Sequence, residues 1–263
     1  MCSLDAEKAF DSCNWGVLFE KLYYEKKVPL PVVKLLKSLY ENGKYSVRYN
    51  GRRSYWFNAS QGVFQGSILS PHLYNAYTEH ILNIINEQST AGTSIHGTFT
   101  GIIAYADDVI LLSPTRNGLQ HLLTLCTNYF DKTAISLNVG KTEFLVSKPS
   151  QTPIYIDLNH HFIPSQNKLK HLGFMWSLKK NSCATLDEVN VQDRINKLWA
   201  AIHSLIRGGS HFCHPHSIAE LYRTLAIPTL TYGLELTHLS ATEMNKLDIQ
   251  GRKALKCLFN LSP

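Results

Sequence analysis

Two adjacent carboxylates at the junction of two apolar runs constrain the fold of this chain most strongly. The pair Asp107-Asp108 lies between apolar residues 101–104 and 109–112. Runs of this kind are typical of buried strands, so the pair marks a tight bend between two strands that are neighbours in a sheet. Adjacent carboxylates repel each other and lose hydration there, and a bound cation offsets that cost. Oxygen ligands of this type select Mg²⁺ or Mn²⁺.

A second carboxylate supports the metal hypothesis over an ordinary hairpin turn, in which Asp is also frequent. Asp5 follows the short apolar stretch 1–4 and precedes a turn towards a helix. Its alternative role is a helix N-cap, while Glu7 and Asp11 are typical of solvated helix charges. If the two strands are adjacent, their carboxylates meet. Three carboxylates around two cations about 3.5–4 Å apart suit in-line phosphoryl transfer.

The composition is that of a globular protein. The 263 residues include 44% hydrophobic and 17% charged residues, with a formal net charge of +6. These values exclude a disordered or collagen-like chain, and no apolar run reaches the roughly 18 residues of a membrane span. The N-terminus has no apolar signal region, and the six cysteines form no C-x-x-C pair. We therefore expect an intracellular protein, in the nucleus or cytoplasm, that is not secreted.

The pattern of elements changes near residue 180. Strands mixed with helices precede that point and only helices follow it, which predicts an α+β domain at 1–180 and a helical domain at 181–263. Asn50-Gly51 is a strong hairpin signal, and Ser240 with Glu243 forms a capping box for the last helix. The second helix is expected to bury Val32, Leu35, Leu36 and Leu39. Helices are expected at 15–27, 31–43, 71–88 and 117–133, and strands at 44–49, 55–57, 94–105, 109–113, 143–147, 154–157 and 171–176.

Five motifs occur in a fixed order along residues 3 to 176. They are Leu4-Asp5 with Ala9-Phe10-Asp11, Gln61-Gly62-Val63-Phe64-Gln65-Gly66-Ser67-Ile68-Leu69-Ser70-Pro71, Tyr105-Ala106-Asp107-Asp108, Leu137-Asn138-Val139-Gly140-Lys141-Thr142, and His171-Leu172-Gly173-Phe174. This ordered set resembles the reverse transcriptase of non-LTR (LINE-type) retrotransposons. The later segment 230–235 is similar to the thumb of that family.

The resemblance implies a right-hand polymerase palm, an antiparallel sheet backed by helices, over 1–180 with the primer-grip hairpin included. An all-helical thumb or connection region would occupy 181–263. Because four residues precede Asp5, we expect the fingers of the family to be missing here. The implied activity is RNA-directed DNA polymerisation with two Mg²⁺ or Mn²⁺ ions. Its partners would be an RNA template, a DNA primer and deoxynucleoside triphosphates.

The resemblance also assigns roles around the acidic motifs. Asp5 and Asp107 would hold both metals, Asp108 would take a lesser share, and the backbone carbonyl of Ala6 would be a further ligand. Phe10 matches the steric gate that excludes a 2′-hydroxyl and so favours deoxynucleotides. Core packing is the alternative role of Phe10.

Three further segments receive roles in the same way. Gln65 and Gly66 match the loop along the incoming nucleotide and template, although Phe64 stands where the family usually has proline. Lys141 matches a lysine that neutralises charge or donates a proton near the pyrophosphate, and a solvated charge is its alternative. Leu172, Gly173 and Phe174 match the primer grip. The basic residues Lys168, Lys170, Lys179 and Lys180 flank this segment and would face backbone phosphates.

Two other groups of residues have less specific patterns. The cluster of His211, Cys213, His214 and His216 could bind Zn²⁺, but its spacing favours a loop between helices. The aromatic residues Tyr23, Tyr24, Tyr45, Tyr49, Tyr55 and Trp56 could stack on bases, and packing is the favoured interpretation.

Two alternative functions remain at this point. The chain could be an inactive retroelement fragment that folds and only binds nucleic acid. It could also be a metal-dependent nuclease, since carboxylate sites with two metals cleave phosphodiesters as well. The second alternative ranks last, because no histidine or lysine base accompanies Asp5 and Asp107 in a nuclease-like pattern.

Overall fold

A six-stranded sheet with the order β11-β12-β10-β1-β9-β8 organises the first part of the chain. The computed structural model describes residues 1–87, 90–147, 154–177 and 183–262. Neighbouring strands are antiparallel except for β10 and β12, which run parallel. The strands are β1 (Cys2–Asp5), β8 (Ile102–Tyr105), β9 (Asp108–Leu111), β10 (Glu143–Leu145), β11 (Tyr155–Leu158) and β12 (His161–Gln166).

Strand β1 lies in the interior of this sheet, between β9 and β10. Its register against β9 pairs Cys2 with Leu111 and Asp5 with Asp108. Cys2 and Leu4 are fully buried, while Ser3 and Asp5 are half-buried. Because side chains alternate along a strand, the apolar residues face the core and Asp5 faces the opposite side.

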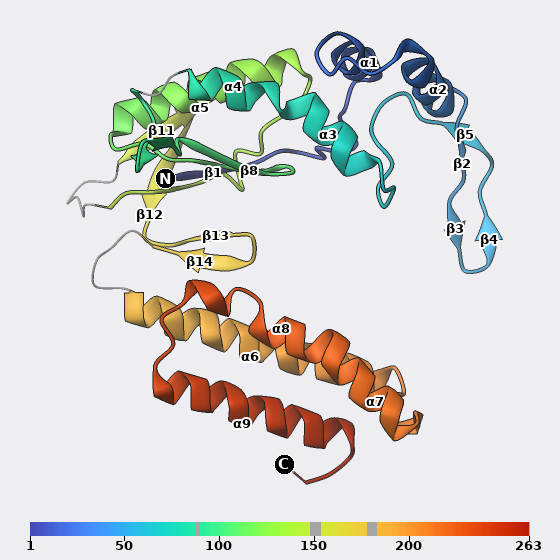
Figure 1. Cartoon of the computed structure of the whole chain (residues 1–263), viewed down its shortest axis with the longest axis vertical. Coiled ribbons are helices and arrows are strands. Elements are labelled where there is room, and N and C mark those ends of the chain that lie inside the picture. The colour runs from blue at the N-terminus through green and yellow to red at the C-terminus, as the bar shows by residue number, and fades with distance from the viewer. Residues whose placement is uncertain (88–89, 148–153, 178–182, 263) are drawn as a thin grey trace. The chain divides into compact units, whose positions relative to one another are not determined.

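Helices cover one face of the sheet (Figure 1). Helix α5 (Arg116–Lys132) and helix α4 (His80–Asn86) pack together, and α5 contacts β9 and β11. The helix periodicity predicted the buried face of α5 correctly, since Leu119, Leu122, Leu123, Cys126 and Phe130 are all buried. Helices α1 (Trp15–Tyr24), α2 (Leu30–Glu41) and α3 (Ser70–Thr78) extend the same hydrophobic core.

Several predicted elements differ in the structure. The helix expected at 71–88 is two helices, α3 and α4, with Glu79 between them. The strand expected at 94–105 is interrupted by a turn at His96 and Gly97, whose φ angles are 50° and 79°. This turn forms the hairpin of β6 (Ser94–Ile95) and β7 (Thr98–Phe99) before β8 begins. Strand β12 was not predicted.

The buried face of α2 was predicted wrongly. Val32, Leu35 and Leu39 are exposed, whereas Val33 and Tyr40 are buried. Tyr40 contacts the rings of Trp15 and Phe19 at centroid distances of 5.7 and 6.1 Å. These aromatic contacts orient the helix and leave its most regular apolar stripe in solvent.

A hairpin follows α2 and extends beyond the helices of this unit (Figure 1). Its strands are β2 (Lys44–Tyr45), β3 (Arg48–Tyr49), β4 (Arg52–Arg53) and β5 (Phe57–Asn58). Asn50 and Gly51 have φ angles of 46° and 76°, as the predicted two-residue turn requires. The packing prediction was wrong for Tyr49, Tyr55 and Trp56, which are 76%, 96% and 60% exposed. Tyr45, which is half-buried, does pack against Phe57 and Phe64.

The described residues divide into two compact units, and the second consists of Ser147 and the residues from Asn167 onward. The second unit contains the hairpin of β13 (Leu169–His171) and β14 (Phe174–Trp176). Among the residues described after this hairpin, helices are the only regular elements, as predicted. These helices are α6 (Cys183–Arg207), α7 (Pro215–Leu221), α8 (Ile227–Thr231) and α9 (Ala241–Leu258), with short helical turns between them. The predicted capping box of Ser240 and Glu243 is present at α9.

Hairpin β13–β14 is joined to the helices of its own unit by polar contacts. The Asn190 side chain of α6 accepts a hydrogen bond from the Met175 N–H (2.9 Å) and donates one to its carbonyl (3.2 Å). The assignment of 1–180 to a palm and 181–263 to a thumb stays a prediction at this point.

Candidate active site

The two acidic motifs meet in one hollow at an end of the sheet. Its volume is about 420 Å³. Asp5 from β1 and Asp107 from the β8–β9 turn both line it, although they are about a hundred residues apart in the chain. The full lining comprises Asp5, Ala6, Glu7, Lys8, Ala9, Phe10, Gln65, Asp107, Asn138 and Lys141.

The strand register produces this convergence. Asp5 is directly opposite Asp108 in the β1–β9 ladder, and Tyr105 pairs with Asp108 across the β8–β9 hairpin. Ala106 and Asp107 therefore form the turn, with Ala106 at a φ of 54°. The two interpretations of the acidic pair are compatible, because the hairpin turn itself carries Asp107 into the hollow. Asp108 is half-buried and is not part of the described lining.

Lys141 brings a positive charge to the carboxylates. Its Nζ lies 3.3 Å from Oδ2 of Asp5. Asn138 fixes the intervening turn, since its N–H donates to the Asp5 carbonyl (2.8 Å) and its Oδ1 accepts from the Lys141 N–H (3.2 Å). The Lys141 side chain is 67% exposed, and a pair this accessible contributes only about 0–1 kcal/mol to folding. Its main consequence is to hold a cation beside Asp5.

The glycine-containing loop 61–66 is fastened to residues 10–13. The Val63 N–H donates to the Phe10 carbonyl (2.7 Å), and the Gly62 N–H donates to the Cys13 carbonyl (2.8 Å). Gln65, which lines the hollow, donates from Nε2 to Oδ1 of Asp11 (3.1 Å). These bonds fix the loop beside the segment that follows Asp5.

The two glycines of this loop have different constraints. Gly62 has a φ of 91°, and a Cβ added there would lie 3.0 Å from both Cα and the carbonyl oxygen of Asp11. Gly66 has a φ of 82°, but a Cβ there would meet no atom within 4 Å. Gly62 therefore permits close backbone approach, whereas Gly66 only permits a turn.

Aromatic stacking positions Phe10 and Phe64. The half-buried Phe10 ring lies parallel to the Tyr74 ring at 4.8 Å and also lines the hollow. Burial raises the pKa of the Tyr74 hydroxyl, which keeps this supporting residue neutral. Phe64, at the position of the family's proline, stacks on Tyr40 at 4.4 Å. The ring thus ties the loop to the core, in a way that proline could not.

Sequence reasoning missed three polar residues of the hollow, Glu7, Lys8 and Asn138. Lys8 has a φ of 47°, a backbone conformation that few residues other than glycine adopt. Its spacing of three residues from Asp5 was the available signal. The hollow thus combines three carboxylates, Asp5, Glu7 and Asp107, with two lysines.

The residues that match the primer grip belong to the second unit. Leu172 and Gly173 form the β13–β14 turn with φ angles of 48° and 75°. The Arg194 guanidinium donates to the Gly173 carbonyl, and the Tyr232 hydroxyl donates to the Leu172 carbonyl (2.9 Å). The guanidinium also lies 4.9 Å from the centre of the Tyr232 ring. Arg194 of α6 and Tyr232, which follows α8, therefore both hold this turn through its backbone carbonyls.

Phe174, the third residue that matches the primer grip, begins β14 directly after this turn. Phe174 is buried, and a Cβ on Gly233 would come within 2.9 Å of its ring. Lys168 and Lys170 are exposed. Lys179 and Lys180 lie outside the described residues.

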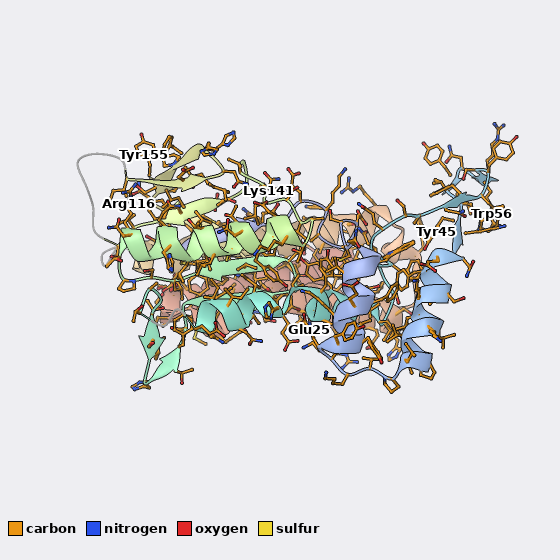
Figure 2. The ribbon with its side chains drawn as sticks, turned by 90° about the horizontal axis from the view of Figure 1, so that it is seen from above. Glu25, Tyr45, Trp56, Arg116, Lys141 and Tyr155 are labelled. Carbon is orange, nitrogen blue, oxygen red and sulfur yellow. The ribbon has the colours of Figure 1, made fainter. Side chains whose placement is uncertain are left out.

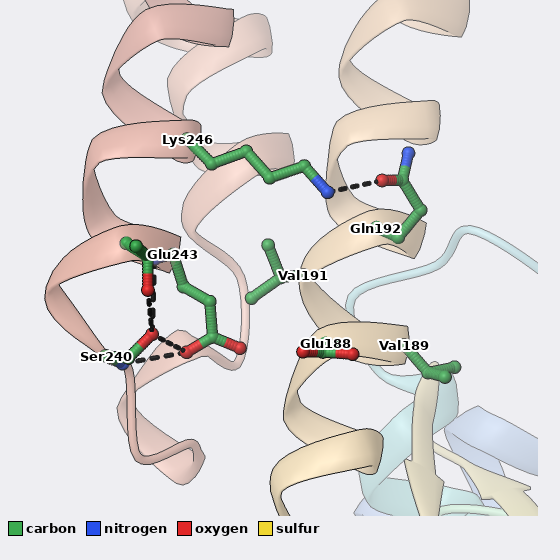
Figure 3. Close-up of a pocket in the computed structure, with 8 residues that line it drawn as sticks. Glu188, Val189, Val191, Gln192, Ser240, Glu243 and Lys246 are labelled. Carbon is green, nitrogen blue, oxygen red and sulfur yellow. Dashed lines mark hydrogen bonds between the residues drawn. The ribbon is translucent and has the colours of Figure 1, made fainter.

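A second hollow, of about 430 Å³, lies between α6 and α9 (Figure 3). Four of its polar side chains bond in pairs: the Ser240 hydroxyl donates to Glu243 (2.6 Å), and Lys246 donates to Gln192 (2.8 Å). The first contact belongs to the capping box. These two pairs serve helix capping and the contact between α6 and α9.

The histidine-rich segment forms a helix start. The Nδ1 of His214 accepts from the His216 N–H (3.2 Å) at the beginning of α7. Within the described residues, no three or more His, Cys, Asp or Glu side chains form a group that could hold a metal ion. Of the three Asp residues that the sequence suggested as metal ligands, Asp5 and Asp107 line the Asp5 hollow.

The comparison with known proteins decides the family. Residues 1–176 match the family described as reverse transcriptase (RNA-dependent DNA polymerase). The chain belongs to the reverse transcriptase family. Relatives from retrotransposable elements confirm the predicted resemblance to the enzymes of non-LTR elements.

The chain is 29% identical over 99% of its length to the Pol polyprotein from type-2 retrotransposable element R2DM of Drosophila melanogaster. It is 27% identical over 97% of its length to the RNA-directed DNA polymerase from mobile element jockey of Drosophila funebris. It covers 24% and 28% of these two relatives, and so spans about a quarter of their length.

A solved structure supports the fold. Telomerase from Candida albicans, in complex with a fragment of telomeric RNA, matches with a TM-score of 0.50 and 12% identity. The match covers 98% of this chain and 47% of that one. The α+β fold predicted from the sequence is therefore confirmed.

The donor set of the Asp5 hollow fits the divalent cation that reverse transcriptases use. Asp5 and Asp107 offer hard oxygen donors, and the ammonium of Lys141 already contacts Asp5 as a cation would. Separately, no helix in the described part of the chain combines the length and the hydropathy needed to cross a membrane.

The contrast between the two loop glycines gives a first prediction. Gly62→Ala combines a left-handed φ with contact against the Asp11 backbone, so it should lower the free energy of unfolding by about 2–4 kcal/mol. Gly66→Ala, the matched control, has the left-handed φ but no such contact. It should lower the free energy of unfolding by about 1–2 kcal/mol. Urea unfolding followed by circular dichroism measures both. Equal losses for the two variants would contradict the role given to Gly62.

The clamp on the β13–β14 turn gives a second prediction. Arg194→Met should lower the free energy of unfolding of the second unit by about 1.5–3 kcal/mol, since a charge-assisted hydrogen bond is lost. Tyr232→Phe should cost about 0.5–1.5 kcal/mol. In a double-mutant cycle the two losses should couple by at least about 0.5 kcal/mol. Strict additivity would show that the two side chains hold the turn independently.

Proposed function

We propose that this chain carries the polymerising centre of an RNA-directed DNA polymerase from a non-LTR retrotransposable element. The observation that supports it best is the shared hollow of Asp5, Asp107 and Lys141. Three separate motifs contribute these residues, and all three lie within residues 1–176, which match the reverse transcriptase family. A primer 3′-hydroxyl would attack the α-phosphorus of a deoxynucleoside triphosphate paired with an RNA template. A new P–O bond forms, and pyrophosphate leaves.

The carboxylates of this centre would hold two Mg²⁺ or Mn²⁺ ions. Bound ions of this kind lower the pKa of an attacking hydroxyl and neutralise the leaving phosphates. Asp5 and Asp107 would be the main ligands, with the Ala6 carbonyl as a further donor and Asp108 in a lesser share. Because Asp5 ends an interior strand and Asp107 is fixed by a two-residue turn, the donors are positioned before substrate arrives.

The lysines of the hollow would act on the triphosphate. Lys141 would neutralise the leaving pyrophosphate or donate a proton to it. In either role Lys141 would lose its contact with Asp5. Lys8 would add a second positive charge on the same side. Neither lysine is enclosed, which suits side chains that reorient towards a charged ligand.

Phe10, Gln65 and Gly66 would select and align the nucleotide. The Tyr74 ring supports one face of Phe10, so the ring is held as a rigid wall that a 2′-hydroxyl would meet. Gln65 is anchored on Asp11 and would lie along the nucleotide and template, and the open space around Gly66 leaves room for them.

The two regions of the chain would take the parts named by the resemblance. Residues 1–180 would be the palm with the primer-grip hairpin, and 181–263 the thumb or connection region. Leu172, Gly173 and Phe174 would hold the primer end. Their support by Arg194 and Tyr232 would give the grip a fixed geometry.

Binding of nucleic acid without turnover is the second candidate function. It is favoured by the exposed basic and aromatic side chains of hairpin 44–58. Binding to RNA that weakens steeply with salt, together with no metal-dependent extension, would identify a chain of that kind.

Primer extension tests the polymerase proposal. On an RNA template with a DNA primer, extension by the wild-type chain should require Mg²⁺ or Mn²⁺ and stop on addition of EDTA. Asp107→Asn should reduce it at least 100-fold, because one ligand charge is lost, whereas Asp131→Asn, an exposed helix carboxylate, should leave it unchanged. Metal-dependent primer shortening would instead indicate a nuclease. Undiminished extension by Asp107→Asn would contradict the proposal.

Sugar selection tests the role of Phe10. Phe10→Val shortens the proposed wall, so the ratio of kcat/KM for ribonucleotides to that for deoxynucleotides should rise about 10- to 100-fold. Phe162→Val, on an exposed ring of β12, is the control and should not change the ratio. Unchanged sugar selectivity in Phe10→Val would show that the Phe10 ring serves only in packing.

A further inference from the structure

The hairpin at residues 44–58 presents a cationic and aromatic surface that the proposed reaction does not use. It contains four positive residues, Lys44, Arg48, Arg52 and Arg53, and no Asp or Glu. All four are exposed. Four rings are exposed beside them, Tyr49, Tyr55, Trp56 and Phe57. A segment of fifteen residues thus holds four positive charges in a chain whose net charge is +6.

An irregular ladder keeps the two most exposed rings in solvent. Tyr45 pairs with Phe57, and Arg48 pairs with Arg53. Two residues separate these pairs on one strand and three on the other, so residues 54–56 include one extra residue, as in a β-bulge. The Ser54 N–H donates to the Val47 carbonyl (2.9 Å), and its hydroxyl accepts from the Val47 N–H (2.9 Å). The strand therefore stays joined while Tyr55 and Trp56 both remain exposed.

Cations and rings lie together on this hairpin. The Arg53 guanidinium lies 5.5 Å from the centre of the Trp56 ring. A hollow of about 630 Å³ lies beside the turn and is lined by Val47, Tyr49, Asn50, Arg52, Arg53 and Ser54. Figure 2 shows Trp56 on the hairpin, beyond the helices of this unit.

The base of the hairpin is anchored to the loop that borders the Asp5 hollow. Tyr45 lies 6.1 Å from Phe57 and 5.6 Å from Phe64, measured between ring centroids. Phe64 in turn stacks on Tyr40 of α2. The base is therefore fixed by aromatic contacts, and the exposed rings belong to a defined surface and not to a loose loop.

The chemistry of this surface selects its partner. A protein partner of ordinary composition would bury the rings but leave four cations without counter-charges, whereas a nucleic acid offers a phosphate for each. Duplex bases are already stacked and cannot accept the rings, but unpaired bases can.

We propose that hairpin 44–58 binds single-stranded nucleic acid. Tyr55 and Trp56 stack on unpaired bases, and Arg48, Arg52 and Arg53 contact the backbone phosphates. This interaction goes beyond the polymerase centre, because it uses neither Asp5 nor Asp107.

Binding of fluorescent oligonucleotides to the full chain tests the proposal. The probes are an unstructured 20-nucleotide RNA, a DNA of the same sequence, and an RNA duplex of the same length. Each single strand should bind more tightly than the duplex. The affinities for RNA and for DNA show which of the two single strands is preferred. Tyr55→Leu and Trp56→Leu should each weaken single-strand binding about 5- to 100-fold with little change in salt dependence. Arg52→Gln and Arg53→Gln should each lower the slope of log affinity against log salt by about 0.7.

Matched variants separate this surface from general effects. Phe162→Leu removes an exposed ring of β12, and Lys34→Gln removes an exposed charge of α2; neither should change affinity by more than about twofold. Asp107→Asn should bind like the wild-type chain, so loss of polymerisation and loss of this interaction are distinguishable. Wild-type affinity in both Tyr55→Leu and Trp56→Leu, or equal affinity for the duplex, would overturn the proposal.

Discussion

The register between β1 and β9 determines where the other parts of the candidate active site lie. It pairs Asp5 with Asp108 and so brings the end of β1 to the β8–β9 turn that carries Asp107. Because side chains alternate along a strand, a slip of one residue would turn Asp5 into the core and Leu4 into the hollow. The buried Cys2 and Leu4 therefore fix the position of a carboxylate at the surface.

The remaining parts of the hollow are attached to this strand pair by backbone bonds. Asn138 bonds to the Asp5 carbonyl and carries the turn with Lys141, while Val63 bonds to the Phe10 carbonyl and carries the loop with Gln65. The hollow therefore depends little on the weak, exposed ion pair between Lys141 and Asp5. In the proposed polymerising centre, this arrangement would let the charged side chains reorient towards substrate without loss of the framework.

Sequence patterns correctly predicted the features that depend on residues close together in the chain. The α5 face follows from helix periodicity, the Asn50-Gly51 turn from backbone freedom, and the Asp107-Asp108 bend from two apolar runs. Other features depend on tertiary packing, which the sequence patterns did not predict. Aromatic contacts of Tyr40 orient α2 so that its regular apolar stripe faces solvent. The bulge at 54–56 likewise depends on strand pairing. The spacing of Lys8 from Asp5 is visible in the sequence, but its φ of 47° is not.

We infer that Asp5 and Asp107 bind the same divalent cation. Calorimetric titration of the chain with Mn²⁺, followed by paramagnetic resonance of the bound ion, measures this directly without any need for turnover. Asp5→Asn and Asp107→Asn should each weaken Mn²⁺ binding at least tenfold, and the double variant should lose little more, because the two residues act on one site. Wild-type Mn²⁺ affinity in either single variant, or independent additive losses, would contradict the shared site.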